Sequence, residues 1–547
     1  MVVTANAHAS RVGAEILARG GNAVDAAVAT SFALAVVEPY HSGIGGGAFL
    51  LIRTAAGETI ALDGREEAPR AATAGMYLEE GVPEDASRLG GLAAGVPGLV
   101  DALCEALAKY GTFSLADVMA PAIALAQDGV PIGPRHAGLL NYWRTQGLAE
   151  RFPETASIQF PPLGEPIRPG WVLRQPELAQ TLREISRKGP DAFYKGPTAQ
   201  AMVDEVQRTG GIWSLEDLAG YQPKTRQAIA GSYRGLQVFS FPPPSSGGVA
   251  LVEILNILEE LPVSERGPGS SASIHLIAEA MKLAFADRAA HLGDADFVSV
   301  PVEGLISKSY AETLRRRINP PWYRRAPWFW FVRERAITVK AAGQPSEDAG
   351  TSHFSIADAQ GNAVAITQTI NLPFGSGLTV PGTGIILNNE MDDFAKAQGV
   401  PNAFGLVDTT GANAIAAGKR PLSSMTPSIL LKDGKLFMLT GSPGGPRIIS
   451  TTLLSILNVV DYGMNAQQAV AASRFHHQWL PDKLFLEPDV PEDVIRALKK
   501  RGHHIEVSQR WWSSAQVILF DHDRGLFFGG SDPRSDGAAM GPGSVSP

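Results

Sequence analysis

The sequence has few of the features that would cross-link it, anchor it in a membrane or attach it to a polyanion. It contains a single cysteine, Cys104, so an intramolecular disulfide framework is excluded and the cysteine count gives no sign of an oxidising compartment. No run approaches the roughly 18 consecutive apolar residues that a membrane-spanning helix needs. The formal net charge of −8 disfavours nucleic acid as a general partner.

The N-terminus also lacks the features of an export signal. The opening MVVTANAHAS carries neither the basic region nor the apolar region of a signal peptide. As written, the chain is therefore expected to be soluble and cytoplasmic. If an export signal has been removed ahead of this start, the compartment is periplasmic or extracellular instead.

Length and composition favour a large folded body. The chain has 547 residues, of which 44% are hydrophobic, and its mean hydropathy is zero. A chain of this size can bury a substantial core, and its length alone predicts two to four domains. One intertwined α/β body is the alternative.

A predicted β-hairpin lies in the stretch 350–371. Residues 351–356 and 363–370 are rich in Thr, Ile, Val and Phe, and the turn-forming residues 358–362 separate them. If the turn is centred on Gln360, Thr351 faces Thr369 across the ladder with side chains roughly 5 Å apart.

The segment before this hairpin has the composition of an exposed, cleavable lead. Residues 340–350, KAAGQPSEDAG, are small and polar, and Gly350 gives the backbone freedom next to Thr351. Cleavage after Gly350 would give Thr351 a nucleophilic hydroxyl and an α-amine of pKa roughly 8, able to accept the hydroxyl proton. The alternative is that Thr351 is an ordinary strand residue.

The N-terminal region predicts buried helices and a second hairpin. Asn22 and Asp25 are predicted to cap an apolar, buried helix that runs to about Val37. The glycine-rich loop 42–47 follows a helix rather than a strand, which favours a tight structural loop over a dinucleotide site. A hairpin over residues 49–63 then places Arg65 just past a strand end, where a surface ion pair is one interpretation.

Further along, residues 95–208 are predicted to be mostly helical, and the Pro run and Ser pair of PPPSSGG, 242–248, to form the entry and N-cap of another helix. The region Arg315–Lys340 is unusual, because it holds eight Lys or Arg residues against the single acid Glu334, with six aromatic residues among them. Either the aromatic side chains pack against the body, or the region contacts a membrane surface or a partner.

Nine stretches together carry a resemblance to a known family. They are GGNAVDAAVA (20–29), SGIGGGAF (42–49), DGREEAP (63–69), PPPSSGG (242–248), the hairpin stretch (350–371), LNNEMDDF (387–394), RPLSSMTP (420–427), GSPGG (441–445) and SDPRSDGAA (531–539). In this order and spacing the chain resembles the gamma-glutamyltranspeptidases, which are N-terminal nucleophile hydrolases. The resemblance implies an α/β fold of four αββα layers, in which a large chain, 1–350, and a small chain, 351–547, arise from one precursor.

The resemblance also assigns the candidate site residues. Thr351 matches the nucleophile, Thr369 the hydroxyl that assists it, and consecutive N–H groups of Gly444 and Gly445 the oxyanion hole. The residues that match the substrate-binding positions are Arg65, Ser423 and Ser424 for the α-carboxylate and Asn371, Glu390 and Asp393 for the α-ammonium group. The chain departs from many relatives at Pro446, which lacks an N–H, and from some at Phe404, where they have a tyrosine on a loop over the pocket.

The implied activity is transfer of a gamma-glutamyl group from amides such as glutathione, through a Thr351 acyl-enzyme, to water or to amino acids and peptides. One alternative is an acylase of the same fold that acts on glutaryl or cephalosporin amides, and another is an inactive homologue that serves as a scaffold. The His476–His477 and His503–His504 pairs lack the spacing of zinc helices, and neither a metal nor a cofactor is expected.

Overall fold

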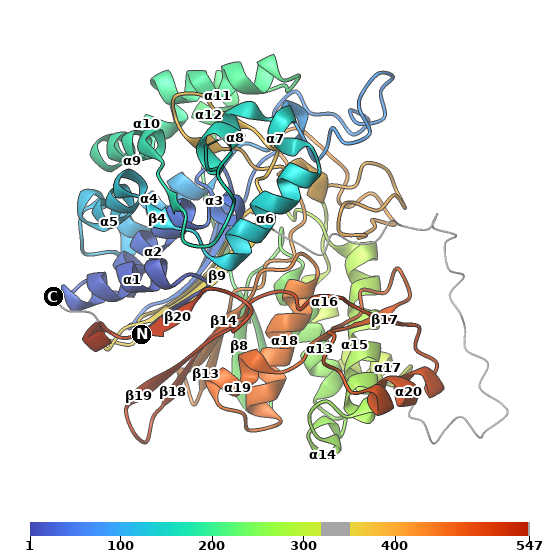
Figure 1. The fold of residues 1–547 in the computed structure, drawn as a ribbon. Coiled ribbons are helices and arrows are strands. Elements are labelled where there is room, and N and C mark those ends of the chain that lie inside the picture. Colours follow the sequence, from blue (N-terminus) through green and yellow to red (C-terminus); the bar gives the residue numbers. More distant parts are fainter. Residues whose placement is uncertain (163, 319–349, 545–547) are drawn as a thin grey trace.

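Two antiparallel sheets stack face to face at the centre of the computed structural model, which describes residues 1–162, 164–318 and 350–544 (Figure 1). The seven-stranded sheet has the order β20 (Ala538–Met540), β1 (Val2–Thr4), β9 (Gly350–Ala357), β10 (Ala363–Asn371), β2 (Gly47–Arg53), β3 (Thr59–Gly64) and β6 (Lys224–Gln227). The six-stranded sheet has the order β19 (Leu526–Ser531), β18 (Gln516–Asp521), β14 (Lys435–Gly441), β13 (Ser428–Lys432), β8 (Leu236–Ser240) and β7 (Ile229–Tyr233).

Helices cover the outer face of each sheet. On the side of the seven-stranded sheet these are α1 (Ala7–Ala18), α2 (Ala23–Val37), α3 (Pro39–Ser42), α4 (Leu99–Tyr110), α5 (Leu115–Asp128), α6 (Pro134–Thr145), α7 (Leu148–Arg151), α8 (Pro153–Gln159), α9 (Pro176–Lys188), α10 (Asp191–Tyr194), α11 (Gly196–Arg208) and α12 (Leu215–Ala219). On the side of the six-stranded sheet they are α13 (Gly247–Leu258), α14 (Val263–Arg266), α15 (Ser271–His291), α16 (Val302–Leu305), α17 (Lys308–Arg315), α18 (Arg447–Val460), α19 (Ala466–Ala471) and α20 (Glu492–Lys500).

Short elements complete the chain. They are the strands β4 (Val130–Pro131), β5 (Val172–Leu173), β11 (Thr379–Val380), β12 (Ile385–Ile386), β15 (Phe475–His476), β16 (Leu484–Leu486) and β17 (Ile505–Val507), and the 3-10 turns η1 (Gly91–Ala93), η3 (Glu390–Asp393) and η4 (Pro542–Ser544). The turn η3 lies within the stretch that the family resemblance assigns to ammonium binding.

Alternation along the strands produces the four layers. In β2, Phe49 and Leu51 belong to the core between the sheets, whereas Leu50 and Ile52 belong to the core under the helices. Because helices or the other sheet cover both faces, β2, β9 and β10 are buried almost throughout. The predicted αββα arrangement is confirmed.

Most local predictions hold. Asn22 and Asp25 form a capping box at the start of the fully buried α2, and the hairpins β2–β3 and β9–β10 form as expected. Of the Ser pair predicted to cap α13, Ser245 accepts from the N–H of Gly247 at 2.9 Å, whereas the side chain of Ser246, at the N-cap position, makes no capping bond. Its hydroxyl instead donates to the Ser423 carbonyl at 2.7 Å and accepts from Arg288.

The glycine-rich loop 42–47 is a tight structural loop. A Cβ on Gly46 would lie 1.9 Å from the carbonyl oxygen of Thr369, and one on Gly45 would lie 2.2 Å from that of Ile386. Glycine is therefore required where this loop packs against β10 and β12.

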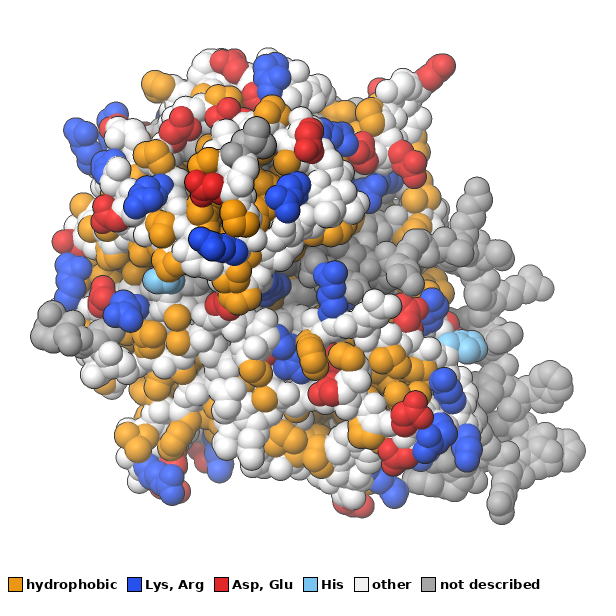
Figure 2. Space-filling view, viewed as in Figure 1, with side chains coloured by type: hydrophobic (Ala, Val, Ile, Leu, Met, Phe, Trp, Pro, Cys, Tyr) orange, Lys and Arg blue, Asp and Glu red, His pale blue; other side chains and the backbone are white. Residues whose placement is uncertain are grey.

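Both sheets combine strands from either side of position 350. The seven-stranded sheet places β9, β10 and β20 among β1, β2, β3 and β6, and the six-stranded sheet pairs β13 with β8. The regions 1–350 and 351–547 therefore form one intertwined body. Figure 2 shows side chains of both charge signs interspersed over one face of it.

Two predictions concern residues outside the described part of the chain. The cleavable lead 340–349 and all but the first four residues of the basic and aromatic region Arg315–Lys340 lie there. Within the described ranges, no helix combines the length and the apolar character needed to cross a bilayer.

Candidate active site

The hairpin β9–β10 places two threonines opposite each other. Thr351 pairs with Thr369, as predicted, and the two Oγ1 atoms are 3.1 Å apart. Phe354 and Ile356 of β9 pack under the helices, so the alternation along the strand directs Thr351 toward the second sheet. The hydroxyl pair is buried between the sheets, at the end of the hairpin away from its turn.

The hydrogen bonds of Thr369 fix the direction of this contact. Its Oγ1 donates to the carbonyl oxygen of Gly350 at 2.9 Å and accepts from the backbone N–H of Asn371 at 2.7 Å. Since a hydroxyl has one proton to donate, Thr351 is the donor in the pair. Thr369 therefore polarises the Gly350 carbonyl and also holds the proton of the Thr351 hydroxyl.

A bulge after Thr369 shapes this end of β10. The register shifts between Thr369 and Asn371, and Asn371 adopts a left-handed conformation with φ of 73°. Such bulges redirect side chains near functional sites. The Nδ2 group of Asn371 donates to the carbonyl of Asn389 at 2.9 Å, which links β10 to the segment that carries η3.

A glycine turn lies at the start of α18. Gly444 and Gly445 have φ values of 134° and 55°, which favour glycine, and Pro446 occupies the N-cap position of the helix. Within the described residues neither glycine N–H donates a hydrogen bond. Two unpaired donors at a helix N-terminus are suited to hold an oxyanion.

Arg65 is fully buried rather than part of a surface ion pair. It contacts three carboxylates: Glu390, Asp393 at 2.5 Å and Glu66 at 3.5 Å. Its Nε donates to the carbonyl of Pro421 at 3.1 Å. The charge of this buried guanidinium is therefore balanced by acids that follow β3 and by acids of η3.

This cluster holds more negative charge than Arg65 can neutralise. Burial raises the pKa of Glu66 to about 7, and it raises the pKa values of Glu390 and Asp393 above their ordinary range despite the attraction of Arg65. Both carboxylate oxygens of Glu66 and the Oε2 atom of Glu390 lack hydrogen-bond partners within the described structure. The cluster therefore retains a proton close to neutral pH.

A small cavity brings the candidate residues together. Its lining consists of Arg65, Thr351, Thr369, Asn371, Glu390, Asp393, Phe404, Leu406, Ser423, Ser424, Met425, Gly445 and Ile448. Its volume of about 20 Å³ holds roughly one water molecule. Every predicted site residue except Gly444 lines it.

Gly444 lines a second, larger cleft of about 330 Å³. The residues around this cleft come from α6 and from the segment 510–513, and they include Arg135, Tyr142 and Trp511. The two cavities adjoin at the Gly444–Gly445 turn. An oxyanion bound at this turn would therefore lie between the small cavity and the larger cleft.

Sequence reasoning missed Glu66 and Ser513 as parts of the site. Glu66 directly follows Arg65, and it is closely enclosed, because a Cβ on Gly47 would lie 2.4 Å from its Oε2 atom. Ser513 lies against Gly444, with its Oγ 2.3 Å from where a Cβ on that glycine would be. The adjacency of Glu66 to Arg65 was the available signal; Ser513 had none. Phe404, predicted to lie over the pocket, does line it.

A threonine near the start of a buried strand, enclosed in an αββα sandwich beside a glycine turn whose N–H groups are free within the described residues, is typical of the N-terminal nucleophile hydrolases, enzymes with autocatalytic processing. The sequence profile described as Gamma-glutamyltranspeptidase matches residues 9–542. The chain belongs to the gamma-glutamyltranspeptidase family.

Individual relatives agree with this assignment. The glutathione hydrolase proenzyme of Escherichia coli K12 is 44% identical over 98% of this chain and 90% of that protein. The acylase ACY 1 proenzyme of Pseudomonas sp. SE83 is 40% identical over 99% of this chain and 93% of its own length. Among solved structures, the cephalosporin acylase of Bacillus halodurans aligns with a TM-score of 0.84 at 31% identity, over 99% of this chain and 95% of that one.

Proposed function

We propose that the chain cleaves itself between Gly350 and Thr351 and that the products, 1–350 and 351–547, stay together. In this step the Thr351 Oγ1 attacks the Gly350 carbonyl carbon, the C–N bond breaks, and an ester forms. The Thr351 nitrogen takes up the hydroxyl proton and becomes a free α-amine as the C–N bond breaks. Water then hydrolyses the ester to a Gly350 carboxylate and the Thr351 hydroxyl. The bond from Thr369 to the Gly350 oxygen supports this role, because it draws charge from the carbonyl that is attacked.

The mature enzyme uses the same hydroxyl on a gamma-glutamyl amide such as glutathione. The α-amine of Thr351 accepts the hydroxyl proton while Oγ1 attacks the gamma-carbonyl, and the leaving amine then takes up that proton. The N–H groups of Gly444 and Gly445 stabilise the oxyanion, and loss of one such donor typically costs about 100-fold to 1000-fold in rate. Water, an amino acid or a peptide then accepts the gamma-glutamyl group.

Recognition of the glutamyl end is assigned to the buried charge cluster. Arg65 and the hydroxyls of Ser423 and Ser424 bind the α-carboxylate, while Glu390 and Asp393 accept from the α-ammonium group, with Asn371 beside them. The cavity is too small for the substrate in this state. Binding therefore requires the substrate carboxylate to replace one acid on Arg65 and Phe404 to move from Gly445, where a Cβ would lie 2.7 Å from its ring.

The observation that carries this proposal is the burial of Arg65, Glu390 and Asp393 within the cavity of the Thr351 hydroxyl. A substrate that has both a carboxylate and an ammonium group offers each of these side chains an opposite charge. Relatives named as glutathione hydrolases and acylases both match the chain, so an acylase activity is the second candidate. A glutaryl group lacks the α-ammonium group, so it would leave the carboxylates of Glu390 and Asp393 without a cationic partner.

Intact mass under denaturing conditions tests the cleavage. In proportion to residue number, 57.9 kDa × 350/547 gives about 37 kDa, which leaves about 21 kDa for a fragment that begins at Thr351. We expect two fragments from the parent, two from Thr351→Ser, which keeps a hydroxyl, and one full-length chain from Thr351→Ala. A single chain in all three would contradict the proposal.

Hydrolysis of matched anilides tests the substrate class. The gamma-glutamyl anilide should have a higher kcat/KM than the glutaryl anilide, which differs only by the missing ammonium. A preference for the glutaryl compound would instead favour the acylase. In the Asp393→Asn variant the preference should shrink, because the contribution of one carboxylate to ammonium binding is lost.

A further inference from the structure

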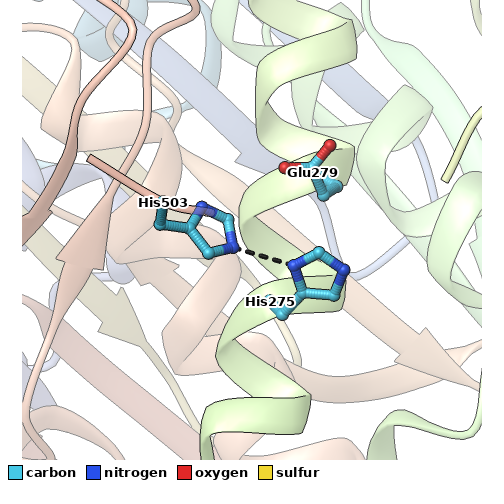
Figure 3. A group of neighbouring side chains, drawn as sticks. All are labelled: His275, Glu279 and His503. Carbon is cyan, nitrogen blue, oxygen red and sulfur yellow. Dashed lines mark hydrogen bonds between the residues drawn. The ribbon is translucent and has the colours of Figure 1, made fainter. Parts of the chain in front are cut away.

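A second cluster of chemically reactive side chains lies far from Thr351 in the fold, on the outer side of the six-stranded sheet. His275 and Glu279 are four residues apart on α15, so they share one face of that helix, and His503 reaches them from the segment after α20 (Figure 3). The Nδ1 atom of His275 and the Nε2 atom of His503 are 2.8 Å apart. One ligand atom from each of the three residues lies within 4.8 Å of the others.

We propose that His275, Glu279 and His503 bind one Zn²⁺ ion. Two imidazole nitrogens and one carboxylate oxygen form a donor set that zinc accepts, with a water molecule in the fourth position of a tetrahedron. At Zn–N distances of about 2.0 to 2.1 Å, two nitrogens of a tetrahedral site are roughly 3.3 Å apart. From their present contact the two nitrogens must separate by about half an ångström, and the rings must turn so that both lone pairs face the ion, which displaces the proton of their hydrogen bond.

The neighbouring groups can adjust to a bound ion. Lys282 Nζ lies 3.2 Å from the Oε1 of Glu279 and 3.3 Å from Asp482, so it retains an acidic partner when Glu279 turns to zinc. Asp482 is also 3.3 Å from the Nε2 of His477. These residues form the charged surroundings that orient ligands around a metal.

The ligands come from both sides of position 350. If the cleavage proposed above occurs, His275 and Glu279 belong to the large chain and His503 to the small one. The ion would then join the two chains at a point outside the two central sheets, between α15 and the segment before β17. This consequence rests on the proposed function, but zinc binding itself does not, since Thr351→Ala protein has the same three ligands.

Zinc binding to metal-stripped protein tests the site. We expect about one Zn²⁺ per chain by competition with a chromophoric chelator, in the parent and in Thr351→Ala. Loss of an outer partner typically weakens a metal site about 10-fold to 100-fold, so loss of a ligand in His503→Ala should weaken binding at least that much. The matched control is His504→Ala, which removes the adjacent histidine, whose side chain is 74% exposed, and should bind as the parent does.

Two further measurements keep the test decisive if a variant folds poorly. Glu279→Gln keeps the side-chain shape and removes the charge, and it should also weaken zinc binding at least tenfold while its circular dichroism stays unchanged. Co²⁺ in the parent should give the visible absorption of a tetrahedral site, and this absorption should be absent from His503→Ala. Failure of the parent to bind one Zn²⁺, or equal binding by the parent, His503→Ala and Glu279→Gln, would overturn the proposal.

Discussion

Two arginines, Arg65 and Arg420, are both completely buried, yet their surroundings differ. Arg420 has an acid or a carbonyl for each of its nitrogens: Asp63 at 2.7 Å, Glu67 at 2.8 Å, and the carbonyl oxygens of Asp63 and Gln222. Arg65 has three acids, and two of them, Glu66 and Glu390, have oxygens without a hydrogen-bond partner in the described structure.

The pKa of the fully buried partner Asp63 differs from the pKa values of the acids around Arg65, whereas burial raises the pKa of Glu67, the second acid on Arg420. Burial opposes the charged form of Asp63, but Arg420 and Arg226 lower its pKa below the ordinary value. Around Arg65 burial prevails, and the pKa values of Glu66 and Glu390 rise. Removing one partner from a saturated buried ion pair leaves an uncompensated buried charge, whereas the cluster around Arg65 already has carboxylate oxygens without a hydrogen-bond partner in the described structure.

The largest expected effect comes from removing Arg420. In Arg420→Met the acids Asp63 and Glu67 lose the guanidinium that they share, and Asp63 keeps only Arg226. Breaking a buried pair in this way typically costs about 3 to 5 kcal/mol of unfolding free energy. Arg65→Met should cost less at pH 6, roughly 1 kcal/mol, because its acid partners can take up protons. Urea unfolding of both variants measures the difference, and equal losses would remove the distinction between the two sites.

The Arg65→Lys variant tests whether Arg65 binds the carboxylate of the substrate. Lysine keeps the charge but cannot form the planar, two-pronged contact with a carboxylate. Loss of one bond to a charged group, about 1.5 to 3 kcal/mol, predicts a kcat/KM for the gamma-glutamyl anilide roughly 10-fold to 150-fold lower. Steady-state kinetics of the cleaved variant provide the measurement. Unchanged kinetics would show that Arg65 does not bind the substrate.

The proton held near Arg65 should make stability depend on pH. The pKa of Glu66 is about 7 in the folded protein and 4.5 ordinarily, so the folded state binds more protons between these values. Its contribution to stability is therefore present below about pH 4.5 and is lost as the pH rises through 7. Glu66→Gln should reduce the slope of unfolding free energy against pH by up to about 1.4 kcal/mol per unit. An identical slope in parent and variant would show that Glu66 does not take up a proton when the protein folds.

Glu67→Gln should have the smallest effect. The side chain of Glu67 is 20% exposed, and a glutamine oxygen can still accept from Arg420. Unfolding free energy should fall by about 1 kcal/mol or less, with no change in anilide kinetics. Because Glu66 and Glu67 are neighbours, this variant is the matched control for Glu66→Gln. A larger change in unfolding free energy from Glu67→Gln than from Glu66→Gln would contradict the distinction between the two arginine sites.

Local sequence signals predicted much of the fold and most of the site. The β-rich runs of 351–370 and their turn predicted the pairing of Thr351 with Thr369, because register in a hairpin follows from its loop. The Asn22 and Asp25 capping signals predicted the start of α2. The family motifs predicted residues that the structure places around one cavity, although their catalytic and binding roles stay predictions until the variants are measured.

The sequence by itself determined the elements, since periodicity, caps and turns act over a few residues. Only the tertiary structure decided that Glu66 is a buried third acid rather than a solvated one, because its burial depends on Gly47 and η3, far away in the chain. Likewise, His503 and its neighbour lack metal-site spacing, and packing of the segment after α20 against α15 brings His503 to His275. Desolvation and long-range contacts set charge and ligand geometry, and neither is encoded by local spacing.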